Sequence, residues 1–171
     1  MTPAIQVLIR QNEQLCDRFA HDVLVAHDVD AALAATAEQT SLVNLPMRTG
    51  AGNRADLRRY LAEDLIPHLP ADLSRHRVSR TADRFRVVDE LVVGFTHDRE
   101  LPWLLPGAAP THRAVEVLAI TVSAIRQGRI AARRTLWDQT GLLARLGLPV
   151  DAVRAGSVAP PEGPSGASGW W

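Results

Sequence analysis

The sequence predicts an α+β fold, in which helices come first and a long antiparallel sheet follows. Apolar residues recur at helical spacing over residues 4–27, which is typical of an amphipathic helix lying on a core. After residue 73 the apolar period changes from about 3.6 to about 2, as expected for strands. Helices followed by a run of strands indicate an α+β architecture. With 171 residues the chain is long enough for one domain with its own core.

Three short elements are expected between the first helix and the sheet. They are a helix over residues 29–39, a brief strand over 40–46 and a helix over 54–66. Asp28 is placed to cap the first of these helices. Asn53 is placed to cap the second, with Asp56 three residues later as in a capping box. Pro67 then ends that helix.

Four successive segments with alternating apolar residues predict the sheet. They are residues 73–82, 84–98, 113–127 and 129–138. The last two are joined by a tight turn at Gly128, and a long Pro- and Gly-rich loop over 99–112 is a candidate lid. A short helix over 139–147 follows the sheet. We therefore expect one domain over residues 1–150 and a flexible Pro-, Gly- and Ser-rich tail over 151–171.

Composition and missing motifs narrow the function classes. The 19 basic and 19 acidic side chains balance, which gives no electrostatic reason to expect a nucleic-acid or membrane partner. The single cysteine, Cys16, excludes an internal disulfide and is expected to be a buried, inert thiol. The sequence shows no signal peptide and no apolar run of about 18 residues, which predicts a cytoplasmic protein. Zinc-protease, nucleotide-binding and serine-hydrolase motifs are absent.

Several stretches resemble the SnoaL-like polyketide cyclases of the nuclear transport factor 2-like superfamily, in particular its carboxymethylenebutenolidase-related branch. These stretches read VDELVVGFTH, PWLLPGAAPT, QGR and WDQTGLLARLGL, and the similarity covers roughly residues 4–150. The resemblance implies a cone, in which a strongly curved antiparallel sheet wraps around the long N-terminal helix. It further implies a hydrophobic small-molecule substrate in the cone, no metal and no organic cofactor, and a homodimer formed through the outer sheet face. Arg133 and Arg134 depart from the family, whose members often have an acidic residue and His there.

Three residues are candidate catalytic groups, each with a structural alternative. Asp138 either caps the helix that follows it or faces the cone as a base with a raised pKa. His97 either is an acid/base group at the pocket mouth or is a loop-edge residue paired with Asp98 or solvent. Glu90 either points inward as an acid or points outward and pairs across the dimer. Side chains alternate between the two faces of a strand, so Glu90 is expected on the face opposite to that of Asp89, Leu91, Val93, Phe95 and His97.

Four further residues are candidates for substrate binding. Arg48, in the loop after the first strand, either binds a carboxylate or enolate oxygen or is solvated. Arg133 either stabilises an oxyanion or forms a cross-strand salt bridge with Glu116. Trp103 and Trp137 are expected to be pocket walls.

Two functions fit these residues. The first is a cofactor-independent cyclase or isomerase, which acts by general acid/base catalysis on a polyketide- or terpenoid-like molecule in a biosynthetic pathway. The second is a non-catalytic ligand-binding or dimeric accessory module with the same cone. A pocket without a titratable group would favour the second function.

Overall fold

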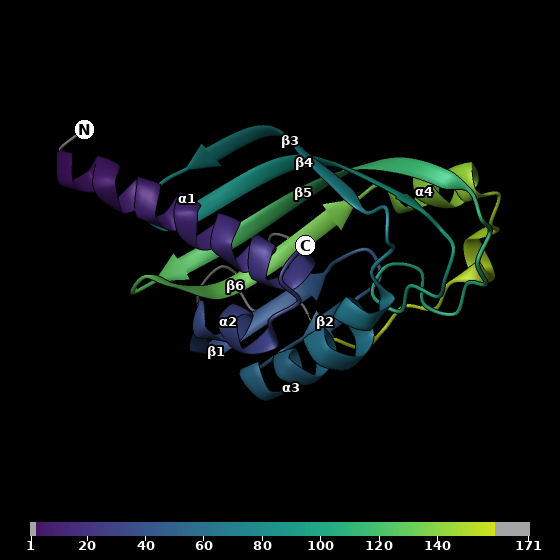
Figure 1. Ribbon diagram of the computed structural model, residues 1–171, viewed down its shortest axis with the longest axis horizontal. Helices are drawn as coiled ribbons and strands as arrows, with labels where there is room; N and C mark the ends of the chain where they lie inside the picture. Colours follow the sequence, from purple (N-terminus) through teal and green to yellow (C-terminus); the bar gives the residue numbers. More distant parts are fainter. Residues whose placement is uncertain (1–2, 160–171) are drawn as a thin grey trace.

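The computed structural model describes residues 3–159 and confirms the predicted α+β fold, with the helices first and the sheet after them (Figure 1). The helices are α1 Pro3–Leu24, α2 Val29–Ala34, α3 Arg54–Arg59 and α4 Gln139–Leu146, with a π-helix, η1, at Tyr60–Leu65 and 3₁₀ turns η2 at Ile66–His68 and η3 at Val150–Ala152. The strands are β1 Thr36–Asn44, β2 Thr49–Ala51, β3 Ser74–Ala82, β4 Arg86–Thr96, β5 Ala114–Arg126 and β6 Arg129–Trp137. Within residues 3–159, no helix combines the length and the apolar character that crossing a bilayer requires.

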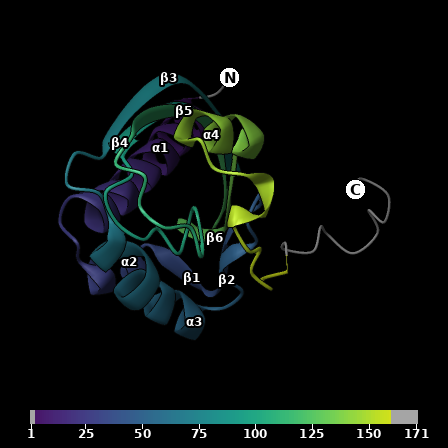
Figure 2. The same ribbon diagram turned by 90° about the vertical axis from the view of Figure 1, so that its right-hand side faces the viewer.

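The six strands form one sheet in the order β2-β1-β6-β5-β4-β3. Neighbouring strands are antiparallel except β1 and β6, whose pairing is parallel and was not expected from the local sequence pattern. The sheet curves strongly, and α1 lies along its concave face (Figure 2). This curvature produces the cone.

The segment after α2 differs from the expected helix over residues 29–39. The helix ends at Ala34, and β1 begins at Thr36, where the Thr36 hydroxyl donates to the Leu33 carbonyl. Thr40 is tied to β6, because its hydroxyl donates to the Ile130 carbonyl over 2.9 Å. Pairing with β6 thus overrides the helical propensity of the alanines.

The expected helix over residues 54–66 begins where the sequence predicts but changes its winding. Asn53 is its N-cap, and its side-chain oxygen accepts from the Asp56 N–H over 2.9 Å. From Tyr60 the helix continues as the π-helix η1, whose buried residues are Tyr60, Leu61 and Leu65. Such π segments are frequent at functional sites because they re-aim side chains.

The apolar stripe of α1 packs on the inner face of the sheet, as its spacing predicts. Its buried residues include Leu15, Cys16, Phe19 and Val23. Burial raises the pKa of the Cys16 thiol, which agrees with the expected inert cysteine. At the wide end of the cone, the loop between β4 and β5 buries Leu101, Leu104 and Leu105 against α4. This loop is therefore part of the core, and it closes the wide end.

The first residues of the expected tail contact the domain. The Arg154 N–H donates to the Pro106 carbonyl, Gly156 to Met47, and Val158 to Arg48. The rest of the expected tail, residues 160–171, lies outside the described residues. The domain boundary at residue 150 remains a prediction.

Candidate functional site

A cavity of about 140 Å³ lies inside the cone, between α1 and the inner face of the sheet. Side chains from α1, β1, η1, β4, β5, β6 and the loop that closes the wide end line it. Most of these side chains are apolar, among them Phe19, Val23, Leu61, Phe95, Leu104 and Trp137. A ligand in this cavity would therefore be largely removed from water.

One row of polar residues crosses the inner face of the sheet. Strand register places five of them in line, from β3 to β1: Arg80, Asp89, Thr121, Thr135 and Asn44. Residues paired across strands point to the same side of a sheet, with Cβ atoms roughly 4.5–5.5 Å apart. Thr135 and Asn44 line the cavity, so the row enters it at one end.

Asn44 and Tyr60 form the polar wall of the cavity. The Asn44 side-chain amide donates to the Tyr60 hydroxyl over 2.9 Å and to the Thr49 hydroxyl over 3.1 Å. Because the Tyr60 oxygen accepts this bond, its own proton is left for another acceptor, and none occurs among residues 3–159. Burial raises the pKa of Tyr60, which keeps this hydroxyl protonated.

Arg133 is the only arginine that lines the cavity in the part of the chain described, and it is 9% exposed. It donates to the Ser123 hydroxyl over 3.1 Å, and its guanidinium carbon lies 5.4 Å from the centre of the Phe19 ring. Burial lowers the pKa of Arg133 to about 10, so the group still carries its charge at neutral pH. Residues 3–159 contain no ion pair between Arg133 and Glu116.

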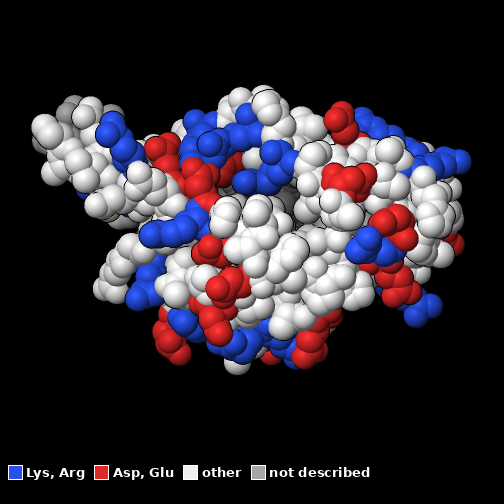
Figure 3. Space-filling model, viewed as in Figure 1, with Lys and Arg blue, Asp and Glu red and all other residues white. Residues whose placement is uncertain are grey.

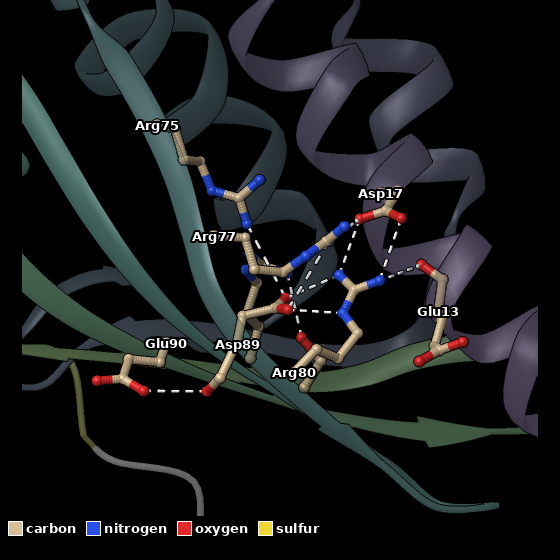
Figure 4. A network of polar contacts seen from close by, with 10 residues as sticks. Glu13, Asp17, Arg75, Arg77, Arg80, Asp89 and Glu90 are labelled. Atoms are coloured by element: carbon tan, nitrogen blue, oxygen red, sulfur yellow. Dashed lines mark hydrogen bonds and ion pairs between the residues drawn. The ribbon is translucent and has the colours of Figure 1, made fainter.

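A network of ion pairs joins α1 to β3 and β4 beside the cavity (Figure 4). Arg80 holds the buried Asp89 through two bonds, of 2.6 and 2.9 Å, and reaches Asp17 of α1 over 2.8 Å. Burial alone would raise the pKa of Asp17, but hydrogen bonds from Arg80 and Arg77 outweigh it and lower that pKa. A β-bulge between Arg77 and Ser79 lets both Arg77 and Arg80 face inward. Within residues 3–159, no three His, Cys, Asp or Glu side chains gather as a metal ion would require.

Comparison with known proteins shows the fold. No protein-family model matches the sequence, and no curated protein matches it. A solved structure assigned to the SnoaL-like polyketide cyclases, from Jannaschia sp. CCS1, superposes with a TM-score of 0.69 at 16% identity, covering 87% of this chain and 97% of that one. The chain has the SnoaL-like, NTF2-like fold.

Two further structures with this fold are described as epoxide-opening or ring-forming enzymes. The epoxide hydrolase/cyclase-like enzyme SalBIII, from pyran ring formation in salinomycin, has a TM-score of 0.57 at 18% identity, covering 77% of this chain and 93% of its own. An LEH-like epoxide hydrolase from M. tuberculosis has a TM-score of 0.58 at 15% identity, covering 81% and 94%. At these identities the likeness to the SnoaL-like fold concerns architecture alone.

In this SnoaL-like fold, the sequence-predicted catalytic residues Asp138 and Glu90 lie outside the cavity. Asp138 is exposed and is the N-cap of α4, where its carboxylate accepts from the Gly141 N–H over 2.9 Å. Glu90 points to the outer face, as strand alternation predicts, and accepts from the Ser79 hydroxyl over 3.0 Å. Asp138 therefore has the geometry of the capping alternative.

His97 directly follows the end of β4 at Thr96, and its side chain is fully buried. Its Nδ1 lies 3.2 Å from the Thr111 hydroxyl, and its Nε2 has no hydrogen-bond partner in residues 3–159. The side chain does not line the cavity. Burial lowers the pKa of His97, so its neutral form is favoured.

The candidate binding residues divide into two groups. Trp103 and Trp137 line the cavity together with Arg133. Arg48 is exposed, lies outside the cavity and approaches the Val158 carbonyl at 3.5 Å.

Sequence reasoning missed three residues: Asn44, Tyr60 and Asp89. For Asp89 the signal was present, because it alternates in phase with the buried residues of β4.

Proposed function

We propose that this protein is a cofactor-independent cyclase or isomerase that acts on a small hydrophobic molecule held in the cone. The observation that carries this proposal is an apolar cavity with hydrogen-bond donors at one end. Its volume of about 140 Å³ resembles that of an engineered cavity of about 150 Å³ that binds benzene. A ligand with one ring therefore suits the site better than a polycyclic one. The polyketide-cyclase and ring-forming descriptions of the structural neighbours support chemistry of this type.

Tyr60 supplies the electrophilic group of the proposed reaction. Its free O–H would donate to a carbonyl or alkoxide oxygen of the ligand, and the raised pKa ensures that the proton is present. A preorganised donor in a water-excluded site stabilises negative charge that develops on such an oxygen. Trp103 offers a second donor, because it lines the cavity and its buried Nε1 has no partner in residues 3–159.

Asp89 supplies the proton acceptor of the proposal. It is buried, lies on the inner face, and occupies the same polar row as Thr135 and Asn44, which line the cavity. The two bonds from Arg80 orient its carboxylate. Asp89 does not itself line the cavity, so in this proposal the proton from the carbon next to the ligand carbonyl reaches it along the row, through the hydroxyls of Thr135 and Thr121, while Tyr60 stabilises the enolate.

Proton exchange into a simple probe tests this proposal. Cyclohex-3-enone is incubated with the protein in D₂O, and α-proton exchange and conversion to the conjugated enone are followed by NMR. Asp89→Asn and Tyr60→Phe should each lower the rate by roughly 10²–10⁴-fold. Glu116→Gln, which changes an exposed carboxylate on the outer face of β5, is the matched control and should leave the rate unchanged. Equal rates in all variants would contradict the assignment.

A non-catalytic binding module is the second candidate. One observation favours it, because no carboxylate and no imidazole lines the cavity itself among residues 3–159. Saturable binding of the probe without any acceleration of exchange over buffer would support this function. The two candidates are therefore separated by measuring binding and exchange on the same samples.

A further inference from the structure

We infer, on the basis of the proposed function, that the natural ligand is a small hydrophobic carboxylic acid whose carboxylate is bound by Arg133. This goes beyond the proposed reaction, because it concerns the group that anchors the ligand and not the group that reacts. Four features of the site carry it: an unpaired buried guanidinium, an excess of positive charge, a polar end and an apolar end.

Arg133 is a buried cation that lacks a counter-ion. Arginines at positions 54, 58, 59, 75, 77, 80 and 99 each form an ion pair, whereas Arg133 forms none with any residue in 3–159. A guanidinium has five N–H donors, and within residues 3–159 that of Arg133 donates to the Ser123 hydroxyl alone. Removing an unpaired charge from water is costly, and a carboxylate is the group that matches a guanidinium with two parallel hydrogen bonds.

The surroundings of Arg133 carry more positive than negative charge. Figure 4 shows Arg75, Arg77 and Arg80 turned toward the carboxylates of Asp17 and Asp89. These two carboxylates are already engaged by the three arginines of β3, at distances from 2.6 to 4.0 Å. Arg133 is therefore a fourth cation near two anions, and an anionic ligand would offset the excess.

The same charges lie next to a hollow in the surface. Figure 3 shows basic and acidic side chains side by side between α1 and β3, beside this hollow. A depression there is lined by Asp17, His21 and Arg75, and it shares Ala20 and Leu24 with the cavity. An anion that approaches by this side would meet Arg75 before it reaches Arg133.

The cavity is polar at one end and apolar at the other. Along β6, Arg133 lies at one end, Thr135 lies midway, and Trp137 lies four residues from Arg133. At about 3.4 Å per residue this separation is about 14 Å. Phe95 and Leu104 surround the apolar end. A ligand with a carboxylate at one end and a ring at the other fits this gradient.

Matched acid and amide probes test the inference. Binding of phenylacetate and phenylacetamide is measured by titration calorimetry at neutral pH, on the wild type, Arg133→Met and Arg134→Met. The wild-type protein should bind phenylacetate at least about 10-fold more tightly than phenylacetamide, because hydrogen bonds between charged groups are stronger than those that involve a neutral group. Arg133→Met should abolish this preference and leave amide binding unchanged. Arg134→Met, on the opposite face of the same strand, should keep the preference.

Three results would overturn the inference. They are equal binding of acid and amide by the wild type, an unchanged preference in Arg133→Met, and no binding of either probe by the wild type. Melting temperature controls for folding, since Arg133→Met should melt at or above the wild-type temperature because it removes an unpaired buried charge. A retained preference for phenylacetate without proton exchange of cyclohexenone would count against the proposed reaction alone.

Discussion

The cap of α4 offers a sharp test, because two residues share one small space. Asp138 covers Gly141 so closely that a Cβ added to Gly141 would lie 2.1 Å from the Asp138 carboxylate. Alanine at position 141 must therefore displace the carboxylate from its bond with the backbone N–H. The effect of Gly141→Ala should depend on whether Asp138 is present.

The magnitudes follow from capping and helix propensity. Asp138→Ala should lower the free energy of unfolding by about 1 kcal/mol, the usual value of a lost N-cap. Gly141→Ala in the wild type should be nearly neutral, because the helix gains up to about 1 kcal/mol of propensity and loses the cap. In the Asp138→Ala background the cap is already lost, so the same substitution should stabilise by up to about 1 kcal/mol. The coupling between the two sites is then about 1 kcal/mol.

Urea denaturation of the wild type, the two single variants and the double variant measures this coupling. The Asp138→Ala variant should also melt about 2–4 °C lower than the wild type. Additive effects, within about 0.3–0.5 kcal/mol, would refute the close contact between carboxylate and glycine. Asp138→Asn should preserve both stability and turnover, because Asn caps about as well as Asp and the side chain lies outside the cavity. A fall in turnover of roughly 10²–10⁴-fold, the size expected for the loss of a catalytic base, would instead show that Asp138 takes part in the reaction.

Two further predictions concern pH and assembly. Burial lowers the pKa of His97, so the His97 imidazole binds a proton more readily in the unfolded chain than in the folded protein. The stability that the neutral His97 contributes is therefore present above about pH 6.5 and is lost as the pH falls. His97→Gln should flatten the decline in melting temperature between about pH 7 and pH 5.5, whereas the exposed-site control His76→Gln should leave its slope as in the wild type. The outer sheet face exposes Leu118, Ile120 and Leu136 at 48%, 42% and 40%, so we expect a symmetric homodimer through this face. Ile120→Glu should then sediment as a monomer at micromolar concentration, and a wild type that is already monomeric there contradicts the expectation.

Features that depend on local periodicity could be predicted from the sequence. The alternation in the β4 segment separates Asp89 from Glu90, and in the structure Asp89 is buried whereas Glu90 points to the outer face. The sequence also indicated that helices begin after Asn53 and Asp138, because an N-cap depends on a contact between residues three positions apart.

The polar wall of the cavity could not be predicted, because it depends on contacts between distant segments. Asn44 contacts Tyr60 because the sheet places the end of β1 beside the helical segment that carries Tyr60. The sequence offered Arg133 as a binding residue, but the absence of an ion-pair partner for it within residues 3–159 depends on side chains that come from distant segments.

The parallel pairing of β1 with β6 has a consequence for how the protein folds. Thr40 and Ile130, which this pairing joins, are 90 positions apart in the chain. Closing so long a loop costs conformational entropy before any contact is gained, and such high contact order slows folding. The hairpins of β3 to β6 are local and can form first. We therefore expect Asn44 to meet Thr135 only in the final stage of folding, so that a chain still emerging from the ribosome has a sheet but no binding site until β6 is complete.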